Sequence, residues 1–276
     1  MSKPDAAISV AIAGVAGRMG RQLAAVSIDR GIHLQGGTEV AAANAYGEDI
    51  GILAGRRAIG LRPVAQVADA ADGAAVWIDF TRPEATLAAL EALAGTSVRA
   101  AVIGTTGFSV AEEEAIKAAA SRFAIVKAGN FSIGVNLLEA LTRLAASHLG
   151  TEWDIEVLET HHRMKADAPS GTALMLGAAA AEGRGAPLSA LRAPPYDGPD
   201  ARRETGKIGF SVRRAGGVIG EHEVTFGSEK ELIRLSHTAL DRSVFAEGAL
   251  HAAIWAAAQP PGLYDMNDVL GLGHTG

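Results

Sequence analysis

The first half of the chain alternates short apolar runs with longer alanine-rich segments. The apolar runs are typical of buried strands, and the alanine-rich segments of helices. The predicted strands are Ile8–Ala13, His33–Gly37, Ala75–Phe80, Arg99–Ile103 and Phe123–Lys127. The predicted helices are Arg18–Asp29, Glu84–Ala94 and Val110–Ser121, the last with Ser109 as its N-cap. This alternation indicates an α/β fold with a doubly wound parallel sheet.

Ligands of such sheets bind beyond the carboxyl ends of the strands, at one edge of the sheet. Four loops follow those ends in this sequence. We therefore expect them to share one rim, and they are Gly14–Gly20, Phe80–Pro83, Gly104–Gly107 and Ala128–Phe131.

The pattern changes after about Phe131. A helix is predicted over Val135–His148, and Phe245–Ala258 is predicted as a final helix before Pro260 and Pro261. Between these helices the predicted strands are Trp153–Glu159, Ile208–Arg213, Glu221–Phe226 and Glu231–His237, with a loop over Ala193–Gly206. A run of strands after a βαβ half predicts a second, α+β domain.

Composition narrows the class of protein. The chain has 276 residues, 48% hydrophobic and 20% charged, with a formal net charge of −6 and no cysteine. At roughly 150 residues per domain, this length favours two globular domains. The acidic balance argues against nucleic acid or an anionic membrane as a partner. With no cysteine, no apolar run of roughly 18 residues and no targeting signal, we expect a cytoplasmic protein without disulfides.

A glycine-rich turn joins the first predicted strand to the first predicted helix. It reads Gly14-Val15-Ala16-Gly17-Arg18-Met19-Gly20, a G-x-x-G-x-x-G variant of the dinucleotide fingerprint. Glycines let the backbone approach a pyrophosphate, whose charge the amides of the helix N-terminus can meet. Glu39, at the end of the second strand, is placed to bind the adenosine ribose hydroxyls. The turn therefore predicts a bound NADH or NADPH.

The residue after Glu39 bears on the choice of nucleotide. An arginine there would accommodate the 2′-phosphate of NADPH, but this chain has Val40. We therefore expect NADH to be used at least as well as NADPH. Arg18 could still reach a phosphate, and the alternative is that Arg18 and Arg21 belong to a solvated helix face.

The segment from Glu159 to Ala173 concentrates chemistry between a predicted strand and a predicted helix. A histidine such as His161 can donate a proton near neutral pH, and Lys165 adds a positive charge. Three residues at the start of the next helix offer amides and hydroxyls to a carboxylate, namely Ser170, Gly171 and Thr172. Together these features favour a small anionic substrate.

Two other interpretations of this segment stay open. Two histidines at a strand end can be plain surface residues, with Ser170 merely capping a helix. A metal could also join His161 or His162 to Glu221, His222 and Glu223. Neighbours on an extended segment point to opposite faces, and Lys165 would repel a cation, so we expect no metal.

At these residues the chain resembles a known family. The motif H-H-x-x-K-x-D-A-P-S-G-T-A, preceded by G-x-x-G-R-M-G, F-T-R-P, G-T-T-G and N-F-S-x-G, is similar to that of the dihydrodipicolinate reductases. The resemblance covers essentially the whole chain. It implies NAD(P)H-dependent reduction of 4-hydroxy-tetrahydrodipicolinate to tetrahydrodipicolinate, with loss of water, in lysine and diaminopimelate biosynthesis. The substrate would be a small cyclic dicarboxylate.

The resemblance also implies roles for single residues. His161 would be the proton donor and Lys165 its cationic companion. The implied substrate-binding residues are His162, Ser170, Gly171, Thr172 and Arg242. Gly14 to Met19 and Glu39 would hold the adenosine and pyrophosphate half of the cofactor. The nicotinamide half would be framed by Gly104, Thr105, Thr106, Ala128, Gly129, Asn130 and Phe131.

The resemblance further implies the domain organisation and assembly. A Rossmann-like dinucleotide-binding domain would comprise residues 1–131 and 242–276, and residues 132–241 would bind substrate and build a homotetramer. Two other functions are weighed against this one. An aspartate-dehydrogenase-like oxidoreductase would share the glycine turn but lack the segment from His161 to Thr172. A catalytically silent dinucleotide sensor would be favoured by the loss of His161 or Lys165, and both are present.

Overall fold

A computed structural model of the chain describes residues 8–273, which divide into two compact units. The first unit contains the described residues up to Ile133 and those from Ser243 onward, and the second runs from Gly134 to Arg242. The expected first domain also includes residues 1–7 and 274–276, which lie outside the described part. The division of roles between the two domains stays a prediction.

The first unit is built on a six-stranded parallel sheet with the strand order β10-β5-β4-β3-β1-β2. Its strands are β1 (Ser9–Ile12), β2 (His33–Gly37), β3 (Val76–Asp79), β4 (Ala100–Ile103), β5 (Ala124–Lys127) and β10 (Gly262–Tyr264). Strands β3 and β4 are buried along their whole length. Burial on both faces explains why these strands are continuous apolar runs rather than alternating ones.

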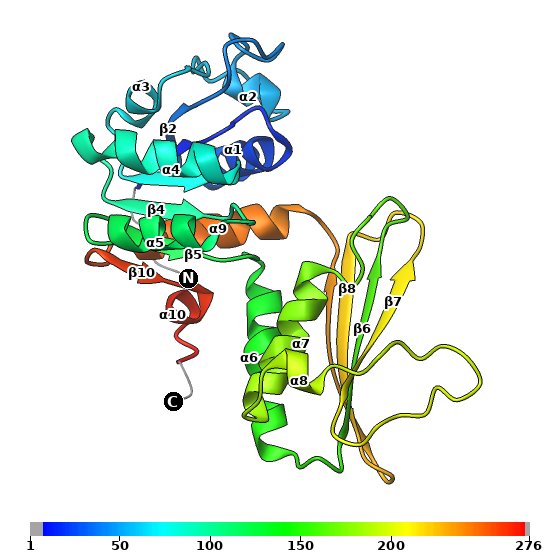
Figure 1. Cartoon of the computed structure of the whole chain (residues 1–276). Coiled ribbons are helices and arrows are strands. Elements are labelled where there is room, and N and C mark those ends of the chain that lie inside the picture. The colour runs from blue at the N-terminus through cyan, green and yellow to red at the C-terminus, as the bar shows by residue number, and fades with distance from the viewer. Residues whose placement is uncertain (1–7, 274–276) are drawn as a thin grey trace. The chain divides into compact units, whose positions relative to one another are not determined.

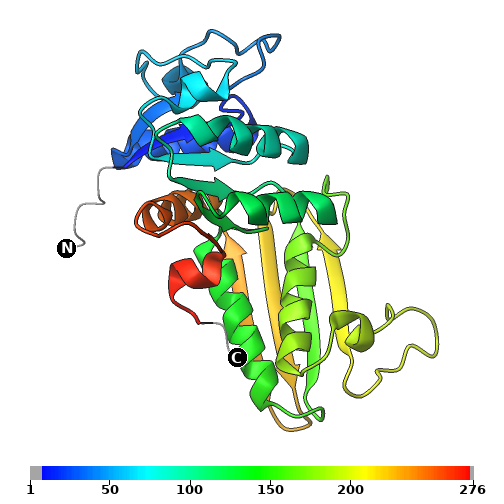
Figure 2. The same cartoon turned by 60° about the vertical axis from the view of Figure 1, so that its left-hand side comes forward.

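Helices cover both faces of this sheet (Figures 1 and 2). One face packs against α1 (Arg18–Arg30), α2 (Ile50–Leu53), α9 (Ser243–Ala256) and α10 (Met266–Leu270). The other face packs against α3 (Val67–Ala71), α4 (Pro83–Ala92) and α5 (Val110–Ala119), and a 3₁₀ turn spans Leu93–Gly95. The expected doubly wound, Rossmann-like unit is therefore confirmed.

Local signals explain where several of these helices begin and end. Ser109 and Glu112 form a capping box at α5, each side chain accepting a hydrogen bond from the other's backbone N–H. Pro83 occupies the first position of α4, where its missing N–H costs nothing. Helix α1 ends at Gly31, whose φ of 70° is left-handed and therefore suits glycine.

The second unit is a four-stranded sheet covered on one face by helices. The strand order is β7-β6-β8-β9, with β6 parallel to β7 and antiparallel to β8. Its elements are α6 (Ile133–His148), β6 (Asp154–His161), α7 (Gly171–Gly183), α8 (Leu188–Leu191), β7 (Ile208–Arg214), β8 (Gly220–Gly227) and β9 (Leu232–Ala239). Helices α6, α7 and α8 pack on the same face (Figures 1 and 2). The second α+β unit is thus confirmed.

The structure adds elements that the hydrophobic pattern missed. β10 has three residues and extends the parallel sheet by pairing with β5, and α10 follows it. The short helices α2, α3 and α8 were also not expected, and α6 begins at Ile133, two residues before its expected start. Elements this short carry too few residues to show a periodicity. No helix among residues 8–273 is long and apolar enough to span a membrane.

Candidate active site

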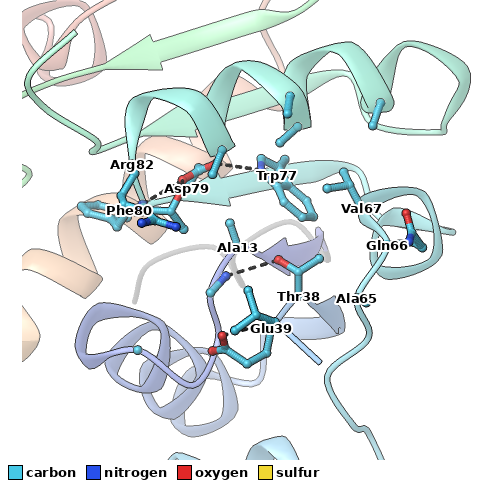
Figure 3. Close-up of a pocket in the computed structure, with 18 of the residues that line it drawn as sticks. Ala13, Thr38, Glu39, Ala65, Gln66, Val67, Trp77, Asp79, Phe80 and Arg82 are labelled. Atoms are coloured by element: carbon cyan, nitrogen blue, oxygen red, sulfur yellow. Dashed lines mark hydrogen bonds between the residues drawn. The ribbon is translucent and has the colours of Figure 1, made fainter. Parts of the chain in front are cut away.

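The four loops that were expected to share a rim do so. They follow β1, β3, β4 and β5, which are parallel and consecutive in the sheet. A cavity of about 850 Å³ opens at this edge of the first unit (Figure 3). Among the predicted cofactor residues, Gly14, Gly17 and Glu39 line this cavity.

The glycine turn has the geometry that close approach of a ligand requires. Gly14 has a φ of +57°, and the Gly17 N–H donates to the Gly14 carbonyl at 2.9 Å. A Cβ at Gly20 would lie 2.3 Å from the Gly14 carbonyl oxygen, so only glycine lets α1 start this close to the turn. Gly17 caps α1 without a side-chain hydrogen bond. The N-terminal amides of α1 therefore suit the pyrophosphate of a dinucleotide.

The other residues of the turn have different surroundings. Val15 is fully buried in the core beneath the turn, and Arg18 is exposed at the first position of α1. Ala16 and Met19 are half-buried. Arg21 donates from Nε to the Ala16 carbonyl at 2.7 Å, so this side chain braces the turn.

Glu39 and Val40 line the same cavity in the loop that follows β2. A Glu39 carboxylate oxygen accepts from the Val40 N–H at 2.9 Å, and Val40 is 63% exposed. Thr38, which sequence reasoning missed, joins the two loops by accepting from the Gly14 N–H at 3.3 Å. The loop that carries Glu39, the predicted ribose-binding residue, is thus tied to the glycine turn through the Thr38 side chain.

The segments expected to frame a nicotinamide include several packed side chains. Thr105 is buried and donates to Asp79 at 3.3 Å, and Phe131 is buried with its ring edge-to-face on Phe80 at 5.4 Å. A Cβ at Gly104 would lie 2.0 Å from the Phe80 ring. These three residues hold the loops together on the rim. The remaining members, Thr106, Ala128, Gly129 and Asn130, are exposed or half-buried.

The second unit brings together the histidine segment at the carboxyl end of β6. Glu159 and His161 are two residues apart on a strand, so their side chains share the face that the helices cover. His161 Nδ1 lies 2.5 Å from a Glu159 carboxylate oxygen, and the Glu159 side chain is fully buried. Burial lowers the pKa of the His161 imidazole, and the Glu159 carboxylate opposes that shift.

Arg214, at the end of β7, pairs with the same carboxylate. Its two terminal nitrogens lie 2.8 and 2.9 Å from the two Glu159 oxygens. Burial alone would raise the pKa of Glu159, but hydrogen bonds from Arg214, His161 and the Ser170 N–H together hold it below its usual value. Glu159 is therefore an ionised carboxylate in the interior.

His222 on β8 completes the cluster from the other side. Its Nε2 lies 3.2 Å from the Ser170 hydroxyl, and its ring meets His161 edge-to-face at 5.0 Å. Burial is the main cause that lowers the pKa of His222 to about 4. The His222 imidazole is therefore neutral at physiological pH.

Ser170 begins α7 as the sequence predicts. Its hydroxyl accepts from the Ala173 N–H at 3.1 Å. A Cβ at Gly171 would meet nothing within 4 Å, which leaves open space beside the first turn, where Thr172 follows. The N-terminus of α7 can therefore receive an anion beside the histidine cluster.

The basic residues around this site have different surroundings. Lys165 lies 3.0 Å from the Asp167 carboxylate and is partly exposed. His162 is half-buried, and its carbonyl accepts from the Lys165 N–H at 3.1 Å. Arg242 is exposed in the segment between β9 and α9. Lys165 and His162 thus flank His161 in one short loop, whereas Arg242 lies on a separate segment.

The metal alternative receives no support. Among residues 8–273, no three or more histidine, aspartate or glutamate side chains are grouped so that they could hold a metal ion. Burial alternates along β8, so Glu221 and Glu223 face away from the side on which His222 is buried.

The sequence analysis gave no functional role to Glu159 or Arg214, and it considered His222 only as a metal ligand. The sequence could have indicated Glu159, because on a strand a glutamate two residues before a histidine lies on the same face as that histidine. Arg214 and His222 carried no such signal, since the register of β6 with β7 and β8 brings them to the site.

Known proteins resemble this chain over nearly its full length. The family model for the N-terminus of dihydrodipicolinate reductase matches residues 8–131, and the family model for its C-terminus matches residues 134–270. A 4-hydroxy-tetrahydrodipicolinate reductase from Parvibaculum lavamentivorans is 50% identical over 267 residues, covering 96% of this chain and 98% of that protein. One from Caulobacter vibrioides is 48% identical over 272 residues, covering 98% and 99%.

Solved structures agree with these matches. A dipicolinate-bound dihydrodipicolinate reductase from Paenisporosarcina sp. TG-14 has a TM-score of 0.73 and 25% identity, covering 94% of this chain and 97% of that one. An amine dehydrogenase from Mycobacterium smegmatis, with a TM-score of 0.64 and 17% identity over 93% and 94%, shares the fold. The chain therefore belongs to the dihydrodipicolinate reductase family of nicotinamide-nucleotide-dependent oxidoreductases.

Proposed function

We propose that this reductase converts 4-hydroxy-tetrahydrodipicolinate to tetrahydrodipicolinate, with loss of water, in lysine and diaminopimelate biosynthesis. The observation that carries the proposal is one short segment of the second unit. It places a buried histidine, a lysine and the N-terminus of α7 together at the end of β6. This combination suits a small dicarboxylate that must be bound and protonated. The names of the close relatives support the same substrate for this chain.

His161 is the proposed proton donor. Because Nδ1 is engaged by Glu159, Nε2 is the ring nitrogen that can transfer a proton to the substrate. A bound nicotinamide nucleotide would supply the hydride that reduces the conjugated imine. Protonation of the enamine carbon by a positioned acid contributes about 10²- to 10⁴-fold to such a step.

Lys165 is the proposed catalytic partner of His161, and the start of α7 is the proposed carboxylate site. Lys165 supplies a positive charge, and Ser170, Gly171 and Thr172 present backbone amides and hydroxyls at the helix N-terminus. His162 is the proposed additional donor and Arg242 a further cation. A net acidic protein can hold a dianion in this way because the positive charges are local.

For the cofactor we propose that NADH serves at least as well as NADPH. Gly14 to Met19 would hold the pyrophosphate and Glu39 the ribose hydroxyls. Val40 is exposed beside Glu39 and offers no charge to a 2′-phosphate. The rim segments from Gly104 to Thr106 and from Ala128 to Phe131 are the proposed nicotinamide end.

We further propose a cytoplasmic homotetramer assembled through the second unit. The helices cover one face of its sheet, so the opposite face is available to other copies (Figure 1). Light scattering of the purified protein tests this directly, and a monomer at micromolar concentration would refute it.

The activity test follows nucleotide oxidation with NADH and NADPH in parallel. The upstream synthase, with pyruvate and aspartate semialdehyde, generates the labile substrate in the cuvette. Substrate-dependent oxidation, with NADH at least as effective, is the expected result. Folded protein that binds dinucleotide but oxidises neither form would refute the reductase proposal and favour a sensor.

A further inference from the structure

The Glu159 carboxylate joins three elements of the second unit. One oxygen accepts from the Ser170 N–H at 3.0 Å and from Arg214 at 2.9 Å, and the other from His161 at 2.5 Å and from Arg214 at 2.8 Å. The side chain is fully buried, so these four contacts replace water entirely. A single carboxylate thus connects β6, the end of β7 and the N-cap of α7.

We propose that Glu159, held by Arg214, is a positioning residue that orients His161 for proton donation and ties it to the carboxylate-binding end of α7. The inference deepens the function proposed above and rests on it. Glu159 lies behind His161 and touches no reacting atom.

The geometry leaves one ring nitrogen for chemistry. Glu159 engages Nδ1 of His161, and on the side of β8 the neighbour of Nε2 is Gly220, where a Cβ would lie 3.2 Å away. Glycine at this position keeps Nε2 uncrowded. Fixing Nδ1 as a hydrogen-bond donor also fixes the tautomer of the neutral ring, with Nε2 ready to regain a proton.

The charges that face His161 act in opposite directions. Burial lowers the pKa of His161, Glu159 raises it, and Lys165 and Arg214 lower it. His222 on β8 is neutral near pH 7. The Asp167 carboxylate forms an ion pair with Lys165, and His237 on β9 lies opposite His222 in the strand register. Glu159 therefore offsets part of the cost of forming a buried imidazolium.

This balance predicts shifts of opposite sign for two variants. Glu159→Gln removes the charge that raises the pKa of His161, so its titration should move down by about one pH unit or more. Arg214→Met removes a charge that lowers it, so the titration should move up. If Glu159 and Arg214 only stabilised the sheet, replacing them would give no reason for the His161 titration to shift in opposite directions.

The test titrates the imidazoles of the full chain by ¹⁵N NMR without substrate, with His161 assigned from a His161→Gln variant. In the wild type we expect neutral His161 with its proton on Nδ1, and in Glu159→Gln a tautomer mixture. Kinetics at saturating substrate should show a fall of about 10-fold or more in kcat, larger than the change in KM. The alkaline limb of the kcat/KM profile, which reports ionisations of the free enzyme, should move with the NMR titration.

Glu156→Gln is the matched control. Glu156 lies on the opposite face of β6 and also pairs with an arginine, Arg203. This control should keep the wild-type titration and pH profile.

Unchanged or same-sign shifts in the two test variants would overturn the positioning role. If the wild type oxidises no nucleotide with substrate, the proposed function fails, while the imidazole titration still decides the role of Glu159. If Glu159→Gln does not fold, the Arg214→Met variant tests the proposal by itself: an upward shift of the His161 titration supports it, and a downward shift or none overturns it.

Discussion

The closest backbone approach in the glycine turn leads to a sharp prediction about cofactor binding. Replacing Gly20 by alanine places a Cβ 2.3 Å from the Gly14 carbonyl oxygen and 2.6 Å from the Val15 Cα. Both neighbours are backbone atoms, so no side-chain rotation relieves the contact. Ordinary contact begins at about 3.4 Å, so α1 and the turn must separate by about 1 Å.

The displacement has a calculable effect on ligand binding. A hydrogen bond from an amide to a charged oxygen contributes about 1.5–3 kcal/mol and weakens steeply when stretched by about 1 Å. Losing one such bond to a pyrophosphate should raise the dinucleotide Kd about 10- to 100-fold. Overpacking should also destabilise the first unit by about 1–3 kcal/mol, partly offset by the helix propensity of alanine, about 1 kcal/mol better than glycine.

The assay compares dinucleotide Kd by calorimetry for the wild type, Gly20→Ala and Gly95→Ala. A Cβ at Gly95 meets nothing within 4 Å, so this control should bind like the wild type. Thermal unfolding of each variant separates lost affinity from lost folding. Wild-type affinity in a folded Gly20→Ala protein would refute the argument that this glycine sets the pyrophosphate site.

Three further predictions concern the two units. Lys165→Ala should lower kcat at saturating substrate at least about 10²-fold; wild-type turnover would remove Lys165 from the mechanism. His222 has a folded pKa of about 4 against an ordinary 6.5, so it is neutral in both the folded and the unfolded chain above pH 6.5. As pH falls from 6.5 towards 4 the unfolded chain takes up the proton first, and the fold loses about 3 kcal/mol of stability. Urea unfolding across that range should therefore be less pH-dependent in His222→Gln, and an unchanged slope would contradict the assignment. Val40→Arg should raise kcat/KM with NADPH about 10-fold relative to kcat/KM with NADH. An unchanged ratio would show that the residue at this position does not contact the 2′-phosphate.

The sequence predicted the parallel sheet because its strands are buried on both faces. A strand such as β4, buried at all four of its residues, must be apolar throughout, and this leaves a run that is visible without any partner. β10 was not predicted because it has only three residues, none of them buried, and so leaves no such run. Its strand character comes from its pairing with β5, more than a hundred residues away in the chain.

The candidate active-site segment was predicted for a different reason. His161, Lys165 and Ser170 lie within ten residues, so their proximity is a property of the chain itself. The sequence by itself therefore determined the fold class, the glycine turn and the candidate proton donor. What the tertiary structure decided is the environment of that donor. Arg214 reaches Glu159 across 55 residues of sequence and His222 reaches Ser170 across 52, because strand register and burial bring them together. Ionisation depends on such neighbours and on exclusion of water, which no local pattern encodes.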